Sequence, residues 1–203
     1  MTLWTAGSRS SGCGYGDAML LRRAAAPIAL FTAVAFAGCT APEPEPEPTV
    51  APPTDEPIFA SEEEALAAAE EVYRAYVKVI DDILKDGGAE PERLDRYAIG
   101  QAAELQKAGF AEALSSGVRS QGETTFVIDK LQHWSGNPSE GSESIAIFVC
   151  QDVSATDLVN ADGKSVSDPG RPPVLPFEIG LTSTASGALV VSRDELWRGP
   201  NFC

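Results

Sequence analysis

The sequence is poor in histidine and in basic residues. It contains a single histidine, His133, among 203 residues, which excludes metal sites built from several imidazoles and the two-histidine zinc motif of metalloproteases. Lysine and arginine together number 15 against 30 aspartates and glutamates, so the formal net charge is −15 at pH 7. Because an acidic surface repels phosphates and anionic lipid headgroups, we expect no nucleic-acid partner and no direct binding to a membrane surface.

The sequence also lacks an apolar run long enough to cross a bilayer. Its apolar stretch over residues 24–36 is well short of the ~20 residues that a transmembrane helix needs, and Pro27 interrupts it. Arg22-Arg23 precedes this stretch, and small residues follow it. A basic start, a short apolar centre and a small-residue end are typical of an export signal. We therefore assign residues 1–38 to a signal peptide, with Met19 as an alternative start.

The end of this stretch resembles the lipobox of bacterial lipoproteins. Phe36-Ala37-Gly38-Cys39 supplies a bulky apolar residue, two small residues and a cysteine, with phenylalanine where the family usually has leucine. The resemblance implies that the sulfur of Cys39 receives a diacylglyceryl group and that a signal peptidase cleaves before it. We therefore expect a protein attached to the cell membrane through a lipid on Cys39, on the extracytoplasmic face. An ordinary secretory cleavage with an unmodified Cys39 is the alternative.

Residues 39–59 form a linker in this interpretation. The segment APEPEPEPTVAPPTDEP, residues 41–57, alternates proline with glutamate over its first half. This composition favours an extended polyproline conformation rising ~3.1 Å per residue, which makes a spacer of roughly 50 Å. Docking of the prolines onto a recognition domain is the alternative, but such sites usually require a neighbouring basic residue, which this segment lacks. Residues 60–203 then form one folded domain.

The expected domain begins with the signals of a long helix. Ser61-Glu62-Glu63-Glu64 is a capping box, in which the serine oxygen accepts a backbone N–H and the last glutamate reaches back to the cap. Apolar residues then recur every three or four positions until Gly87-Gly88 stops the helix. We expect a second helical region from Pro91 to Leu105 and a short third one from Phe110 to Gly117.

Beyond these helices the pattern changes to the two-residue period of strands. Four strands are predicted, over residues 124–134, 144–151, 174–182 and 188–192, with a turn at 183–187. Helices followed by an antiparallel sheet define an α+β fold, and we expect the long helix to lie across a curved sheet.

At this level the chain resembles the NTF2-like (SnoaL-like) proteins found among small lipoproteins of actinobacteria. The resemblance rests on the segments AEEVYRAYVKVIDDIL, CQDVSATDLVNADGKSV and ELWRGPNFC. It implies a cone-shaped, cystatin-like α+β domain, and it carries no catalytic set with it. Enzymes of this superfamily place acid–base and hydrogen-bonding side chains inside the cone. The residues of this chain whose types suit such a cavity are Tyr73, Tyr76, Tyr97, Asp129, Trp134 and Asp152.

These residues leave two functions open. A buried aspartate with a raised pKa beside a tyrosine would suit enolisation or dehydration, but tyrosines on an apolar helical stripe belong to the core far more often than to an active site. We therefore expect a non-catalytic domain that binds a small ligand or an envelope protein. The alternative is a small isomerase, dehydratase or hydrolase using Asp129 or Asp152. We expect no cofactor, and a homodimer remains open.

The cysteines predict a disulfide in the exported domain. Cys13 and Cys39 belong to the targeting region, which leaves Cys150 and Cys203. An even pair in an oxidising compartment favours a structural bond, whereas a redox-active pair would usually have Cys-x-x-Cys spacing.

The segment that follows Cys150 superficially resembles a calcium loop. Its aspartates and the run Asn160-Ala161-Asp162-Gly163 suggest one, but the EF-hand template needs a ligand where Leu158 stands and a glutamate where Pro169 stands. We therefore interpret the segment as a turn whose side chains bond to the local backbone, and expect no metal. His133, near a strand end, is expected to be exposed to solvent.

Overall fold

The computed structural model describes residues 57–139 and 141–203. The signal peptide, the lipobox with Cys39 and most of the linker lie outside these residues, so the predictions made for them stay predictions. Among the described residues, no helix has both the length and the apolar character that crossing a membrane requires.

Helix α1, Glu62–Lys85, is the long helix that the sequence predicts. The hydroxyl of Ser61 accepts the backbone N–H of Glu64 at 3.2 Å, and the Glu64 carboxylate accepts the N–H of Ala60 at 2.7 Å. The glutamate therefore reaches one residue beyond the cap. A Cβ added to Gly88, whose φ is +84°, would lie 2.1 Å from the carbonyl oxygen of Phe110. Glycine is required at this point because the chain turns directly against the backbone of Phe110.

Two further helices follow, with bounds that differ from the expectation. The 3-10 helix η1 covers Pro91–Arg96, and α2 covers Gly100–Ser116 without a break. The sequence pattern suggested two separate segments here because the apolar stripe of this region is weak. Helix α2 ends at Gly117, whose φ of +64° is the left-handed conformation common at helix ends.

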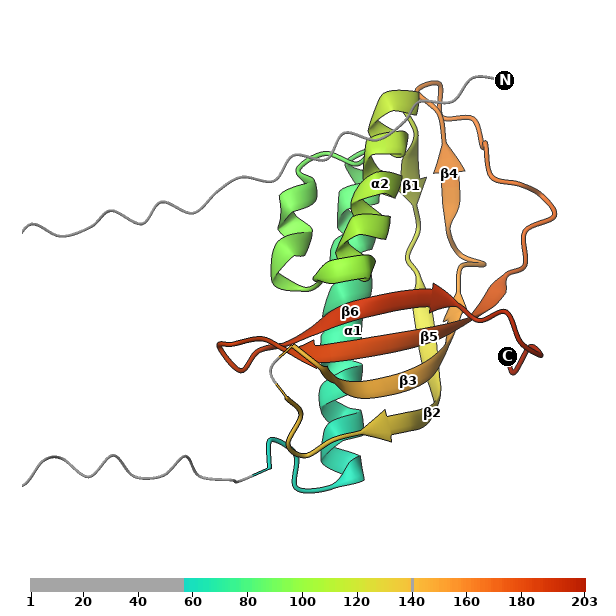
Figure 1. The fold of residues 1–203 in the computed structure, drawn as a ribbon. Coiled ribbons are helices and arrows are strands. Elements are labelled where there is room, and N and C mark those ends of the chain that lie inside the picture. Colours follow the sequence, from blue (N-terminus) through green and yellow to red (C-terminus); the bar gives the residue numbers. More distant parts are fainter. Residues whose placement is uncertain (1–56, 140) are drawn as a thin grey trace, which may run out of the picture. The chain divides into compact units, whose positions relative to one another are not determined.

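A four-stranded antiparallel sheet follows the helices, in the spatial order β2-β3-β5-β6 (Figure 1). Its strands are β2 (Thr125–Trp134), β3 (Glu143–Asp152), β5 (Val174–Ser183) and β6 (Leu189–Leu196). Two short strands that were not anticipated, β1 (Arg119–Gln121) and β4 (Asp157–Val159), pair with each other. The prediction of an α+β fold with about four main strands is confirmed.

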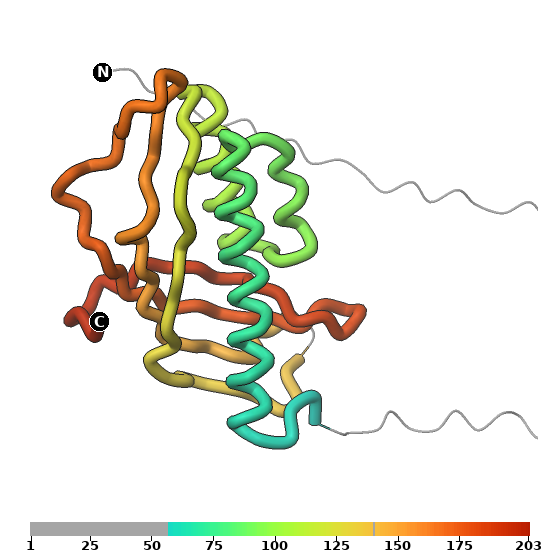
Figure 2. The backbone as a smooth tube through the Cα atoms, turned by 180° about the vertical axis from the view of Figure 1, so that it is seen from behind, coloured from blue at the N-terminus to red at the C-terminus, as the bar shows by residue number. Residues whose placement is uncertain are grey.

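Helix α1 lies across one face of this sheet, which we call the inner face (Figure 2). Alternate residues of β3 and β5 point toward the helix and are fully buried. They are Ile145, Ile147, Val149, Ile179 and Leu181. Because both strands lie in the middle of the sheet, the core is centred between them and α1.

The C-terminal tail covers part of the opposite, outer face. Cys150 is bonded to Cys203, with 5.6 Å between their Cα atoms, so the predicted disulfide is present. Since Cys150 and Phe148 are two residues apart on β3, both point outward. The ring of Phe148 packs edge-on against Trp197 and Phe202, each with a centroid separation of 5.2 Å. The bond therefore holds an aromatic cluster against the sheet.

Candidate functional site

A β-bulge in β6 places a carboxylate on the inner face. Leu181 of β5 pairs with Val191, but the next residue of β5, Gly180, pairs with Arg193, so Ser192 is an extra residue in β6. The hydroxyl of Ser192 donates to the carbonyl of Gly180 at 3.2 Å. The extra residue reverses the alternation of β6 beyond it, as bulges near functional sites often do. Asp194, opposite the inward-facing Ile179, therefore points into the core.

The carboxylate of Asp194 is buried, and only one of its two oxygens accepts hydrogen bonds from the described residues. The residue is 2% exposed. Its Oδ2 accepts the hydroxyl of Tyr76, on α1, at 2.7 Å and the side-chain amide of Gln106, on α2, at 3.1 Å. Its Oδ1 has no hydrogen-bond partner among the described residues. An unpaired buried oxygen costs free energy, so each one in a native structure calls for an explanation.

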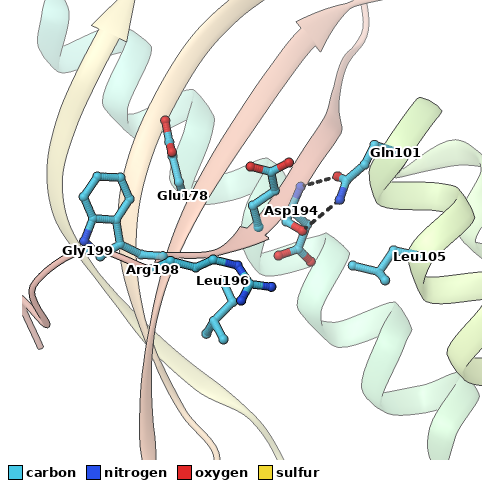
Figure 3. Close-up of a pocket in the computed structure, with 9 residues that line it drawn as sticks. Gln101, Leu105, Glu178, Asp194, Leu196, Arg198 and Gly199 are labelled. Carbon is cyan, nitrogen blue, oxygen red and sulfur yellow. Dashed lines mark hydrogen bonds between the residues drawn. The ribbon is translucent and has the colours of Figure 1, made fainter.

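Main-chain and side-chain bonds hold α2 against β6 and so position Gln106. The side chain of Gln101 pairs with the backbone of Asp194, accepting its N–H at 3.0 Å and donating to its carbonyl at 3.4 Å (Figure 3). The N–H of Ile99 donates to the carbonyl of Val191 at 2.9 Å. These contacts cover an edge strand whose backbone groups would otherwise be free. They also hold the start of α2 beside the bulge.

A second polar pair lies next to Asp194 on the inner face. The side-chain amide of Gln151, on β3, donates to the hydroxyl of Tyr73 at 2.7 Å. The rings of Tyr73 and Tyr76 are 5.9 Å apart, and both tyrosines are fully buried. The structure therefore groups two tyrosines, two glutamines and one aspartate from α1, α2, β3 and β6 between the helices and the sheet.

Three members of this group, Gln106, Gln151 and Asp194, line a pocket of about 230 Å³, which we call the inner pocket. It is lined by Val77, Ile80, Asp81, Leu84, Gln106, Ser120, Thr124, Gln151, Val153, Thr156, Leu158, Arg171, Phe177 and Asp194. Asp194 also borders a second, larger depression of about 570 Å³ along the end of β6. Asp194 therefore belongs to the lining of both, and Figure 3 shows it among the residues of the larger depression.

Two other charged groups of the inner pocket have fixed positions. The carboxylate of Asp81 accepts the backbone N–H of Thr124 at 2.7 Å and its hydroxyl at 2.8 Å, which ties α1 to the start of β2. The guanidinium of Arg171 donates to the carbonyl of Val153 at 3.0 Å and also to Thr156. Arg171 thereby holds the loop before β5 against the segment that follows β3.

Burial shifts the proton affinity of the central groups. Desolvation raises the pKa of Asp194 above its ordinary value, and the hydrogen bonds from Tyr76 and Gln106 only partly oppose this. Desolvation and the nearby Asp194 carboxylate also raise the pKa of Tyr76 and of Tyr73. Both tyrosines therefore stay neutral at physiological pH, and Asp194 is the titrating member of the group.

This shift predicts how stability depends on pH. Because the folded-state pKa of Asp194 lies above its ordinary value of 3.8, its contribution is complete below that value and is lost as pH rises through the folded-state pKa. The unfolding free energy of the wild type, relative to Asp194→Asn, should therefore fall with rising pH above 3.8 and then level off. Urea unfolding of both proteins across this range measures the difference. A difference that grows with pH would contradict the raised pKa.

The structure separates the six residues proposed from sequence. Tyr73 and Tyr76 do not line the inner pocket themselves, but their hydroxyls bond to Gln151 and Asp194, which do. Tyr97 and Trp134 are partly buried against the core, and neither lines the inner pocket. They therefore belong to the packing of the domain.

The two aspartates of that proposal lie elsewhere. Asp129 is exposed on β2. The carboxylate of Asp152 accepts the N–H of Ser154 at 2.8 Å, and bonding to Ser154 lowers its pKa. His133 is exposed, as expected. A desolvated carboxylate is thus found at Asp194 instead of at the aspartates named from sequence.

Sequence reasoning missed Asp194 and its glutamine partners. The last strand was expected to end at residue 192, whereas β6 continues to Leu196. A strict two-residue alternation from Val191 would point Asp194 outward, and a bulge is not visible in the residue pattern. One signal was available: Gln101 and Gln106 are polar residues near the apolar positions of an expected helix.

Comparisons with known proteins add little to this picture. No protein-family model matches the chain, and no curated protein matches it. Among solved structures, the intermembrane space region of the chloroplast protein ARC6 is similar at 12% sequence identity with a TM-score of 0.47, over 66% of this chain and 96% of that one. In the described part of the chain, no cluster of three or more histidine, cysteine or acidic side chains is arranged to hold a metal ion.

Proposed function

We propose that this chain is an extracytoplasmic lipoprotein whose folded domain, residues 60–203, is an NTF2-like cone that binds a small ligand without transforming it. The membrane anchor is the lipid on Cys39, and the proline-rich linker carries the domain away from the bilayer. The anchor rests on the lipobox. The binding role rests on one observation: the inner pocket is lined by a buried aspartate, Asp194, whose Oδ1 has no hydrogen-bond partner among the described residues.

The arrangement of the pocket supports binding between helices and sheet. Polar side chains of α1, α2, β1, β3 and β6 line the pocket, together with apolar side chains of α1, β4 and β5. A small-molecule site typically combines a mainly apolar lining with a few placed polar groups. The NTF2-like assignment is supported by the long helix on an antiparallel sheet and by the resemblance of the sequence segments.

A small enzyme of the isomerase, dehydratase or hydrolase type is the second candidate, and one observation favours it. Asp194 is a desolvated carboxyl with a raised pKa beside the hydroxyl of Tyr76, a combination used for proton transfer. We prefer binding because the Tyr76 hydroxyl already donates to Oδ2, so it would have to leave Asp194 to act on a substrate. Recovery of a bound ligand chemically unchanged after long incubation supports binding, and turnover supports the enzyme.

Mass spectrometry of the full chain, expressed in a bacterium that processes lipoproteins, tests this proposal. Under denaturing conditions we expect a protein that begins at Cys39 and carries a diacylglyceryl adduct, and Cys39→Ser should abolish both the adduct and membrane attachment. Under native conditions we expect a small molecule that is released on unfolding. An unlipidated product beginning elsewhere would refute the anchor, and a protein that never carries a small molecule would refute the binding role.

A further inference from the structure

We propose that the ligand of the inner pocket is a small organic cation, a protonated amine with an apolar body, whose positive charge is held by the carboxylate of Asp194 in the pocket lining. This inference rests on the proposed binding function and names the chemical class of the ligand.

The hydrogen-bond inventory of the site calls for a donor. An ionised carboxylate only accepts hydrogen bonds, and Tyr76 and Gln106 both donate to Oδ2, which leaves Oδ1 as the free acceptor. Because the amide of Gln106 faces a carboxylate, its Nε2 must point to Asp194 and its Oε1 away from it. Among the described residues, no group donates to that Oε1. Two neighbouring residues of the pocket lining, Asp194 and Gln106, therefore each carry an acceptor oxygen that is not engaged within the described residues.

The charges around the pocket favour a cation over an anion. Asp194 carries no ion pair with a lysine or arginine of the described residues, and Asp81 adds a second carboxylate to the lining. Arg171 is the cation of the lining, and its guanidinium already donates to Val153 and Thr156. Tyr73 and Tyr76 contribute hydroxyls that stay neutral. A buried carboxylate without a counter-charge is costly, and a bound ammonium would offset that cost.

The remaining lining suits an apolar body attached to the amine. Val77, Ile80 and Leu84 of α1 face Phe177 of β5 around the pocket. Its volume of about 230 Å³ accommodates a molecule the size of a single aromatic ring with a short side chain. The chain as a whole is strongly acidic, with a net charge of −15, which attracts cations toward the site and repels anions.

Calorimetry with three probes of similar shape and different charge tests the inference. Phenethylamine, phenylethanol and phenylpropanoate would be titrated into the full-length protein at moderate salt. We expect phenethylamine to bind best. Asp194→Asn removes the charge, and with its amide oxygen kept by Tyr76 and Gln106 it places an NH2 group where Oδ1 was; it should weaken amine binding by about 10- to 100-fold, the range for an interaction with a charged group. Asp129→Asn is the matched control: it removes the same charge from an exposed position on β2 and should leave binding unchanged.

The other outcomes separate the ligand class from the binding function. If phenylethanol or phenylpropanoate binds as well as the amine, or if Asp194→Asn leaves amine binding unchanged, the cation is wrong while a binding pocket remains. If Asp129→Asn weakens binding equally, the amine responds only to overall charge and the site is refuted. If none of the probes binds, the cation proposal fails, and the co-purified small molecule sought by native mass spectrometry still decides the binding function.

Discussion

Replacing both Cys150 and Cys203 by serine is expected to lower the free energy of unfolding by about 4 kcal/mol. The two residues are 53 positions apart, and closing a loop of that length removes about this much conformational freedom from the unfolded chain. For a domain of this size the loss corresponds to a fall in Tm of roughly 10 °C or more. Urea denaturation, followed by tryptophan fluorescence, measures the stability.

Reduction of the wild type provides the control for this variant. A reductant should lower the wild-type Tm to that of the double serine variant, and it should leave the variant unchanged. Because Cys150 lies on the outer face, the folded variant should still bind phenethylamine at Asp194. A loss of less than about 1 kcal/mol would show that the bond adds little to stability, in disagreement with the loop-closure argument.

Replacing Asp194 by leucine is expected to destabilise the fold by about 3 kcal/mol at neutral pH. The substitution fills a similar volume but leaves the buried donors of Tyr76 and Gln106 without an acceptor, at about 1 to 3 kcal/mol each. Relief of the desolvated charge offsets part of this cost. Asp194→Asn is the matched comparison, because its amide oxygen can still accept from both donors, and it should cost less than about 1 kcal/mol.

The double variant Asp194→Leu, Tyr76→Phe identifies the source of the loss. If the unpaired hydroxyl is responsible, removing it should recover about 1 kcal/mol or more of the stability lost in Asp194→Leu. Urea denaturation of the single and double variants completes a mutant cycle. Equal effects of leucine and asparagine at this position would show that the hydrogen bonds of Asp194 do not hold the two helices to β6.

The parts of the fold that could be predicted from sequence depend on local rules. The cap at Ser61, the apolar stripe of α1 and the stop at Gly87-Gly88 each act within a few residues, so the helix and its bounds could be read directly. The disulfide followed from counting the cysteines outside the targeting region. The main strands followed from runs of alternating apolar residues, which are clearest in β5.

The site could not be predicted in the same way because it depends on non-local geometry. Asp194 faces inward only because Ser192 is an extra residue in β6, and that bulge is defined by pairing with Gly180 on another strand. Gln106 reaches the carboxylate because the start of α2 is bonded to the edge of β6. The tyrosines were identified by type, but their partners come from elements that only the folded chain brings together.

Titration of the Asp194 carboxyl carbon by NMR, with and without phenethylamine, tests the central claim most directly, because it reports on the atom group that defines the site. In the free protein we expect a pKa above the ordinary value of 3.8, and bound amine should lower it because a neighbouring cation stabilises the charged carboxylate. An ordinary pKa in the free protein that does not move when the amine is added would contradict both the buried carboxylate and its role as the binding group.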